Sequence, residues 1–136
     1  MKKFILLPVL IVLCTLLIAC DNDKDDDPIN KIEGAFSLLS YDCCLLTQED
    51  YVVGEIIYDF DGANMVTVWF TISPTPESQL PIQTAGVYEY TEIDNRLVLN
   101  GIEYEFTLIG DQLTLFDDPE LDGAIITFKE FQLEDE

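Results

Sequence analysis

The sequence predicts an all-β domain whose strands run antiparallel, up and down, and close into a barrel. Three observations support this fold class. Apolar and polar residues alternate over short stretches, as they do in strands with one buried face. Two-residue turn signals, such as Asn100-Gly101 and Asp61-Gly62, separate these stretches. After residue 29, no stretch shows a helical period of useful length.

The chain begins with a leader that we do not assign to this domain. Lys2 and Lys3 form a positive region, and residues 4–18 form an apolar one. The segment Leu17-Ile18-Ala19-Cys20 that closes it resembles the lipobox of bacterial lipoproteins. The resemblance implies cleavage before Cys20 and a covalent lipid on its thiol, and we expect no other cofactor. A secretory signal without lipid and a retained membrane anchor are the competing interpretations, although the apolar run is shorter than the roughly 20 residues that span a bilayer.

An acidic tether follows the leader. Residues 21–27 contain five aspartates and one lysine. This run resembles the export signal of Bacteroidota lipoproteins, which implies a lipid-anchored protein on the outer surface of the outer membrane. The periplasmic face is the alternative location, and in enteric bacteria Asp21 would instead suggest retention at the inner membrane. The predicted organisation is therefore a signal peptide over 1–19, a lipidated cysteine and tether over 20–31, and a barrel domain over 32–133.

The charge of the chain limits its partners. The formal net charge is −21, from 6 basic and 27 acidic residues. Removing the leader removes Lys2 and Lys3 but no acidic residue, so the mature charge is 4 − 27 = −23. Nucleic acid is excluded as a partner, because phosphate binding requires clustered Lys and Arg. A polybasic contact with anionic lipid is excluded for the same reason, which leaves the lipid anchor as the predicted link to the membrane.

Each strand is predicted from its alternation and its flanking turns. In the clearest one, Tyr104 and Phe106 face one way while Glu103 and Glu105 face the other. Residues 73–77 and 117–123 are predicted loops, since they are rich in turn residues and proline cannot sit in a central strand. In chain order, the predicted strands are residues 35–41, 54–60, 64–72, 86–93, 96–99, 102–109, 113–116 and 124–131.

Eight consecutive antiparallel strands with one apolar face each must protect their edges. Closure into an up-and-down barrel removes the edges directly. A two-sheet β-sandwich is the alternative architecture. Small barrels are often filled by their own side chains.

The strand pattern also resembles a known family. Residues 32–38 resemble the opening Gly-x-Trp-x-Leu strand of lipocalin-like proteins, with Phe36 in place of the tryptophan. Residues 86–90, 97–99, 104–108 and 111–115 resemble the later strands of small lipocalin-like lipoproteins of Bacteroidota. This resemblance covers most of residues 32–131 and implies a lipocalin-like barrel that binds a small apolar or amphipathic molecule at its mouth. The candidate ligand-binding residues are Tyr58, Val68, Trp69, Phe70, Tyr88, Tyr104, Phe106 and Phe128.

Three functions are consistent with these features. The first is a surface-tethered, non-enzymatic lipocalin-like lipoprotein that binds a small molecule. The second is a structural or protein-interaction lipoprotein with a filled barrel, because the domain is shorter than a typical ligand-carrying lipocalin. The third is a carboxylate-based hydrolase. The chain has no histidine, so Ser-His-Asp and Cys-His catalysis are excluded, and we expect no enzyme activity.

Two local motifs contain residue types that could form a chemical site. Asp118, Glu120 and Asp122 imitate the first half of a calcium loop, but Lys129 stands where a bidentate Glu is needed. They are therefore a weak metal candidate, and no metal is expected. Cys43 and Cys44 could form a vicinal disulfide, a thiol pair or a soft-metal contact. We expect two small, partly buried residues at a strand end without a catalytic role.

Overall fold

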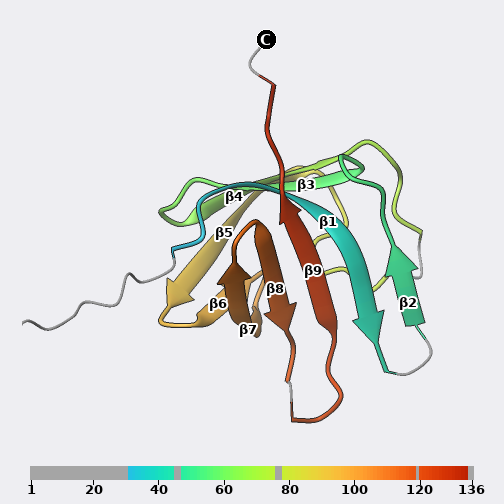
Figure 1. Cartoon of the computed structure of the whole chain (residues 1–136), viewed down its shortest axis with the longest axis vertical. Helices are drawn as coiled ribbons and strands as arrows, with labels where there is room; N and C mark the ends of the chain where they lie inside the picture. Colours follow the sequence, from blue (N-terminus) through green and yellow to red (C-terminus); the bar gives the residue numbers. More distant parts are fainter. Residues whose placement is uncertain (1–30, 45–46, 76–77, 119, 135–136) are drawn as a thin grey trace, which may run out of the picture.

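The computed structural model describes residues 31–44, 47–75, 78–118 and 120–134. The described residues form nine antiparallel strands in one sheet, which confirms the all-β class (Figure 1). The leader, Cys20 and the tether up to residue 30 lie outside the described residues. The strands are β1 (Gly34–Cys43), β2 (Thr47–Asp50), β3 (Ile56–Phe60), β4 (Met65–Phe70), β5 (Gly86–Ile93), β6 (Arg96–Leu99), β7 (Ile102–Ile109), β8 (Gln112–Phe116) and β9 (Ile125–Glu130).

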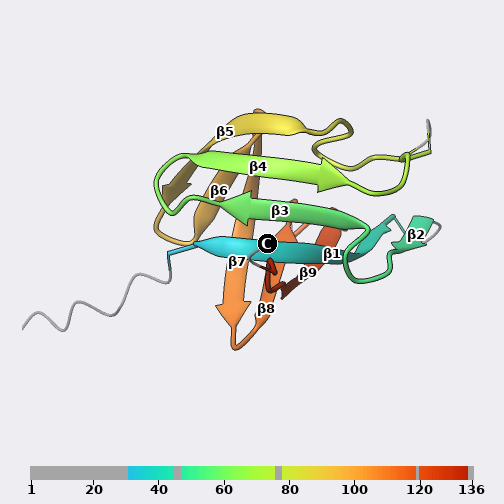
Figure 2. The same ribbon diagram turned by 90° about the horizontal axis from the view of Figure 1, so that it is seen from above.

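The sheet closes into a barrel because β1 pairs on both of its edges. Phe36 lies opposite Tyr58 of β3 on one side and opposite Glu130 of β9 on the other. From β3 to β9 each strand pairs with the next, so the predicted up-and-down meander is confirmed. The strands form one continuous sheet, so the alternative of a two-sheet sandwich is wrong. Figure 2 shows β1, β3, β4 and β5 side by side on one wall of the barrel.

Strand β2 is an addition that the sequence analysis does not predict. It pairs with the second half of β1, where Tyr41 lies opposite Glu49, while β3 pairs with the first half of β1. The two short strands thus share one edge of the ten-residue strand β1. The sequence of β2, Thr-Gln-Glu-Asp, has no alternation of apolar and polar residues, which explains why a search for that pattern misses this strand.

The barrel interior is filled by apolar side chains. The ring of Tyr58 meets Phe128 edge-on with centroids 5.1 Å apart, and Phe60 meets Tyr90 in the same way at 5.1 Å. Such edge-to-face pairs are a favourable arrangement of aromatic rings. The side chains of Tyr58, Val68, Tyr104, Phe106 and Phe128 are buried in this interior, and Phe70 is partly buried and packs against it.

Both ends of the barrel are covered by chain segments. At one end, the segment between β4 and β5 buries Leu80 and Ile82 against the core. Its position is fixed by the Asn100 side chain, which donates to the Pro81 carbonyl at 2.8 Å. At the other end Ile32 is fully buried, and its backbone N–H donates to Glu92 Oε2 at 3.1 Å.

The described residues contain no helix long and apolar enough to cross a membrane.

Candidate functional site

Most of the predicted ligand-binding residues lie in the core of the barrel. Tyr58, Val68, Tyr104, Phe106 and Phe128 have at most 5% of their surface exposed. Their side chains fill the space in which an interior ligand would lie. Whether these residues contact a ligand stays a prediction.

The remaining predicted residues lie at the barrel's rim or outside it. Trp69 is 39% exposed on the outer face, where it lies opposite Ile57 of β3. Tyr88 is half-buried, and its hydroxyl donates to the Thr84 carbonyl at 2.7 Å. Phe70 packs against the edge of the core. Phe70 and Tyr88 thus pack against the core that holds the five buried residues, whereas Trp69 lies on the outer face.

A pocket lies at the end of the barrel where β1 and β8 end and β9 begins. Its volume is about 680 Å³, which is within the range of small-molecule sites. We call it the mouth pocket. Its described lining comes from the β1–β2 hairpin and from the end of β8 and the start of β9: Asp42, Cys43, Cys44, Thr47, Gln48, Phe116, Asp122, Gly123, Ala124 and Ile125.

Four of the residues that line the mouth pocket form a row across four neighbouring strands. Phe116 of β8 lies opposite Ile125 of β9, Ile125 opposite Asp42 of β1, and Asp42 opposite Gln48 of β2. Directly opposite residues in an antiparallel sheet share one face. The row faces outward, because the residue next to Ile125, Ile126, is fully buried. Figure 1 shows β8, β9, β1 and β2 side by side.

Polar groups of the pocket are mostly hydrogen-bond acceptors. The Ser40 hydroxyl donates to Asp42 Oδ2 at 3.3 Å, which orients this carboxylate. Asp122, in the loop between β8 and β9, supplies a second carboxylate to the lining. The described lining includes no lysine or arginine. The pocket is therefore electrostatically unsuited to an anionic ligand.

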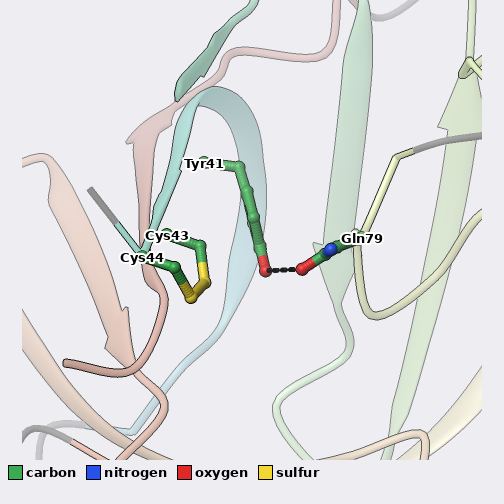
Figure 3. Close-up of a disulfide and its surroundings, with 4 residues drawn as sticks. All are labelled: Tyr41, Cys43, Cys44 and Gln79. Carbon is green, nitrogen blue, oxygen red and sulfur yellow. Dashed lines mark hydrogen bonds between the residues drawn. A yellow bond between two sulfur atoms is a disulfide. The ribbon is translucent and has the colours of Figure 1, made fainter. Parts of the chain in front are cut away.

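A disulfide between Cys43 and Cys44 lines the same pocket (Figure 3). This is one of the three arrangements open from the sequence. Cys43 packs against the core, whereas Cys44 is exposed and has a positive φ of 57°. A disulfide has no S–H donor, so it gives the pocket a compact, polarisable and weakly polar surface.

The loop between β8 and β9 shapes the other side of the pocket. Gly123 is required there, because a Cβ at this position would overlap the carbonyl oxygen of Asp117. The Asp118 carbonyl accepts from the backbone N–H groups of Leu121 and Gly123, at 3.0 and 3.2 Å. The three weak metal candidates, Asp118, Glu120 and Asp122, are all exposed in this loop. Among the described residues, no group of three acidic, cysteine or histidine side chains is placed to hold a metal ion.

A polar network holds the segment that covers the barrel end. The Tyr41 hydroxyl donates to Gln79 Oε1 at 3.4 Å, as Figure 3 shows. Glu49 Oε2 accepts from the hydroxyls of both Ser78 and Tyr51. Burial and the hydrogen bond to Glu49 raise the pKa of Tyr51 to about 12, so this tyrosine stays protonated at neutral pH. The segment between β4 and β5 is thus joined to β1 and β2.

Sequence reasoning missed the mouth pocket because its residues lie on four strands. Only the register between strands brings Phe116 and Asp42 to one surface. The single local signal is the adjacent pair Cys43 and Cys44 at a strand end, which the sequence analysis expects to be structural.

A scan against protein-family models gives no match for this chain, and no curated protein sequence matches it.

Proposed function

We propose that this chain is a lipid-anchored, non-enzymatic binding protein of the lipocalin-like type, exposed on the outer membrane. The lipobox-like segment before Cys20 and the acidic run after it support the anchor and the location. The closed antiparallel barrel supports the lipocalin-like type. In this role, one tethered domain holds a small amphipathic molecule.

The observation that carries the binding function is the mouth pocket. Its volume of about 680 Å³ is sufficient for a small ligand, whereas the barrel axis is occupied by side chains such as Tyr58 and Phe128. We therefore propose that the ligand binds at the rim of the barrel. This differs from the site that the lipocalin resemblance implies, which lies in the interior.

The position of the pocket suits an anchored binding protein. The chain enters the barrel at Ile32, beside Tyr90 and Glu92 near the end of β5. The mouth pocket lies at the opposite end, where β1 and β8 end. A tether that joins the barrel at Ile32 leaves the pocket at the end remote from the attachment point.

Lipidation is tested by mass spectrometry of the mature protein extracted from membranes. We expect an N-terminal Cys20 that carries a diacylglyceryl group and an acyl chain. Cys20→Ala should accumulate as an unprocessed precursor that is not acylated. An unmodified N-terminus at another residue would refute the anchor.

Binding is tested by native mass spectrometry of the full mature protein, extracted in detergent from its own host. A retained small molecule should be lost from the Phe116→Ala variant but kept by Trp69→Ala, which removes an exposed aromatic ring outside the pocket. Loss in Trp69→Ala alone would move the site to the outer face of β4. Absence of any retained molecule from the wild-type protein would count against the binding function.

A protein-interaction role is the second candidate. It is favoured by exposed apolar side chains in the β2–β3 connection and after β4, where Val53 is 52% and Ile72 is 36% exposed. Cross-linking of the anchored protein on intact cells distinguishes this candidate. A stoichiometric protein adduct that Val53→Ser together with Ile72→Ser abolishes would favour it over ligand binding.

A further inference from the structure

We propose that the mouth pocket binds a neutral oligosaccharide, an inference that rests on the binding function proposed above. The row of Phe116, Ile125, Asp42 and Gln48 provides an apolar half and a polar half side by side. Sugar rings present the same division, because C–H groups form one face while hydroxyls project around the edge. The row therefore matches a ring or a short chain of rings lying across the strands.

The apolar half is formed by three kinds of surface. Phe116 is half-buried, so one part of its ring stays accessible, and Ile125 is 41% exposed beside it. The disulfide of Cys43 and Cys44 lies on the same pocket. None of these surfaces donates a strong hydrogen bond, so each suits the C–H face of a sugar ring.

The polar half consists of acceptors that match hydroxyl donors. Asp42 is held by the Ser40 hydroxyl at 3.3 Å, and the Gln48 side chain lies opposite it on β2. Gln48 Nε2 donates to Asp50 Oδ1 at 3.4 Å, which directs its carbonyl oxygen away from that contact. Hydrogen bonds from hydroxyls to a carboxylate are among the stronger ones in proteins.

The charge of the pocket selects against other ligand classes. Asp42 and Asp122 repel fatty acids, phosphates and acidic sugars. A cation would be attracted, but a chain with a net charge of −21 attracts cations over its whole surface. A neutral, hydroxyl-rich ligand can use both the carboxylates of Asp42 and Asp122 and the apolar surface of Phe116 in one pocket.

The size of the row fits an oligosaccharide better than a single ring. Adjacent strands lie about 4.8 Å apart, so a row across four strands is about 14 Å long. The pocket opens along this row at the barrel end, since it is lined from both the β1–β2 hairpin and the β8–β9 loop. A short chain of rings can therefore lie along it with both ends in solvent.

Isothermal calorimetry on the full lipidated protein in phosphatidylcholine nanodiscs tests this proposal. The neutral probes are cellotriose, maltotriose and triacetylchitotriose, and the charged probes are spermidine and laurate. We expect saturable binding of at least one neutral trisaccharide. Asp42→Asn should weaken it about tenfold or more, and Phe116→Leu, which keeps an apolar side chain but removes the aromatic ring, should weaken it about fivefold.

Asp94→Asn is the matched control, because Asp94 is exposed at the other end of the barrel. Its φ of 55° is also tolerated by asparagine, so the fold is expected to remain intact. It should leave the affinity unchanged. Equal weakening by Asp94→Asn and Asp42→Asn would show a general charge effect and overturn the site.

The disulfide is tested separately, by titration before and after reduction with a phosphine. Reduction should weaken trisaccharide binding about threefold, because two thiols replace one fixed surface. The Cys43→Ser, Cys44→Ser double variant should bind as weakly as the reduced protein and should not respond to the reductant. Unchanged affinity in both cases would remove the disulfide from the site.

The remaining outcomes separate this inference from the function on which it rests. If no trisaccharide binds but spermidine or a retained native molecule binds and Phe116→Leu weakens it, the ligand class is wrong and the mouth pocket stands. If a trisaccharide binds equally to wild type, Asp42→Asn and Phe116→Leu, the assigned site is wrong. If no probe binds and no molecule is retained, both proposals fail.

Discussion

Tyr58 and Asp61 differ in how their polar groups are satisfied in this fold. Tyr58 is fully buried, and its hydroxyl has no hydrogen-bond partner among the described residues, although the backbone of Ile82 approaches it. Burial raises its pKa, so it stays neutral. Asp61 is exposed at a turn, and its Oδ1 accepts from three backbone N–H groups, those of Ala63, Asn64 and Met65. The ring of Tyr58 thus serves packing, whereas the carboxylate of Asp61 organises the backbone.

The first prediction concerns the Tyr58 hydroxyl. A buried hydroxyl without a partner contributes no stability, so Tyr58→Phe should leave the free energy of unfolding unchanged or raise it by up to about 1 kcal/mol. Tyr58→Ala also removes the ring that packs edge-on against Phe128, and should lower it by about 3–5 kcal/mol. Urea denaturation measures both. Clear destabilisation by Tyr58→Phe would reveal a hydrogen bond that the structure does not show.

The second prediction concerns pH and the β3–β4 turn. The backbone N–H groups of Ala63, Met65 and Asn64 lower the pKa of Asp61. A carboxylate with a lowered pKa in the folded state stabilises the protein above its unfolded pKa, and this contribution is lost as pH falls through the folded value. Asp61→Ala should therefore lower the melting temperature at pH 7, and the difference should shrink below about pH 4.

Asp61→Asn is the control for this turn. The asparagine keeps an acceptor oxygen but carries no charge and does not titrate. Asp61→Asn should therefore lower the melting temperature at pH 7 less than Asp61→Ala does. Melting curves of the three proteins between neutral and acidic pH provide the measurement. A constant difference between wild type and Asp61→Ala across that range would contradict the role of the charge.

At the scale of elements, strands with strong local signals were predictable and those without were not. The bounds of β5, β6 and β7 match the predicted ranges, because alternation and the Asn100-Gly101 turn define them. Strand β2 has no alternation and exists because β1 extends beyond β3. The mouth pocket was equally hidden, since its row depends on the pairing of β8, β9, β1 and β2. The local sequence pattern thus predicts individual strands, whereas the pairing register between strands determines which residues line the mouth pocket.

The segment between β4 and β5 was predictable only in part. Its prolines indicate a loop, and residues 71–75 and 78–85 are not in strands. Nothing local distinguishes Leu80 and Ile82, which are buried, from Ile72, which is exposed. The difference arises from contacts distant in sequence, such as the hydrogen bond from Asn100 to Pro81.

The third prediction tests this segment as part of the core. Ile82 is 1% exposed, so Ile82→Ala should lower the free energy of unfolding by about 2–5 kcal/mol. Ile72→Ala, in the same connection but 36% exposed, should lower it by less than about 1 kcal/mol. Chemical denaturation of both variants decides the matter. If both variants lowered the free energy of unfolding by similarly small amounts, the segment would lie over the core without contributing to it.

At the scale of the whole molecule, the charge is large and poorly balanced. The formal net charge is −21, and the described ion pairs are Arg96 with Glu103 at 2.8 Å and Lys129 with Asp111 at 3.7 Å. All four side chains are more than half exposed, so these pairs contribute little to stability. Repulsion among carboxylates therefore opposes the compact barrel and favours solubility.

The last prediction follows from this imbalance. Salt screens charges over about 30 Å at 0.01 M but over about 8 Å at 0.15 M, so sodium chloride should weaken the repulsion more than it weakens the two surface pairs. We expect the melting temperature at pH 7 to rise by roughly 2–8 °C between these concentrations, equivalent to about 1 kcal/mol or less. At pH 4 many carboxylates are protonated, and the rise should be smaller. Differential scanning calorimetry of the whole protein measures both series. A melting temperature that falls with salt at pH 7 would show that local ion pairs outweigh the net charge, and a rise of equal size at both pH values would assign the effect to the salt itself.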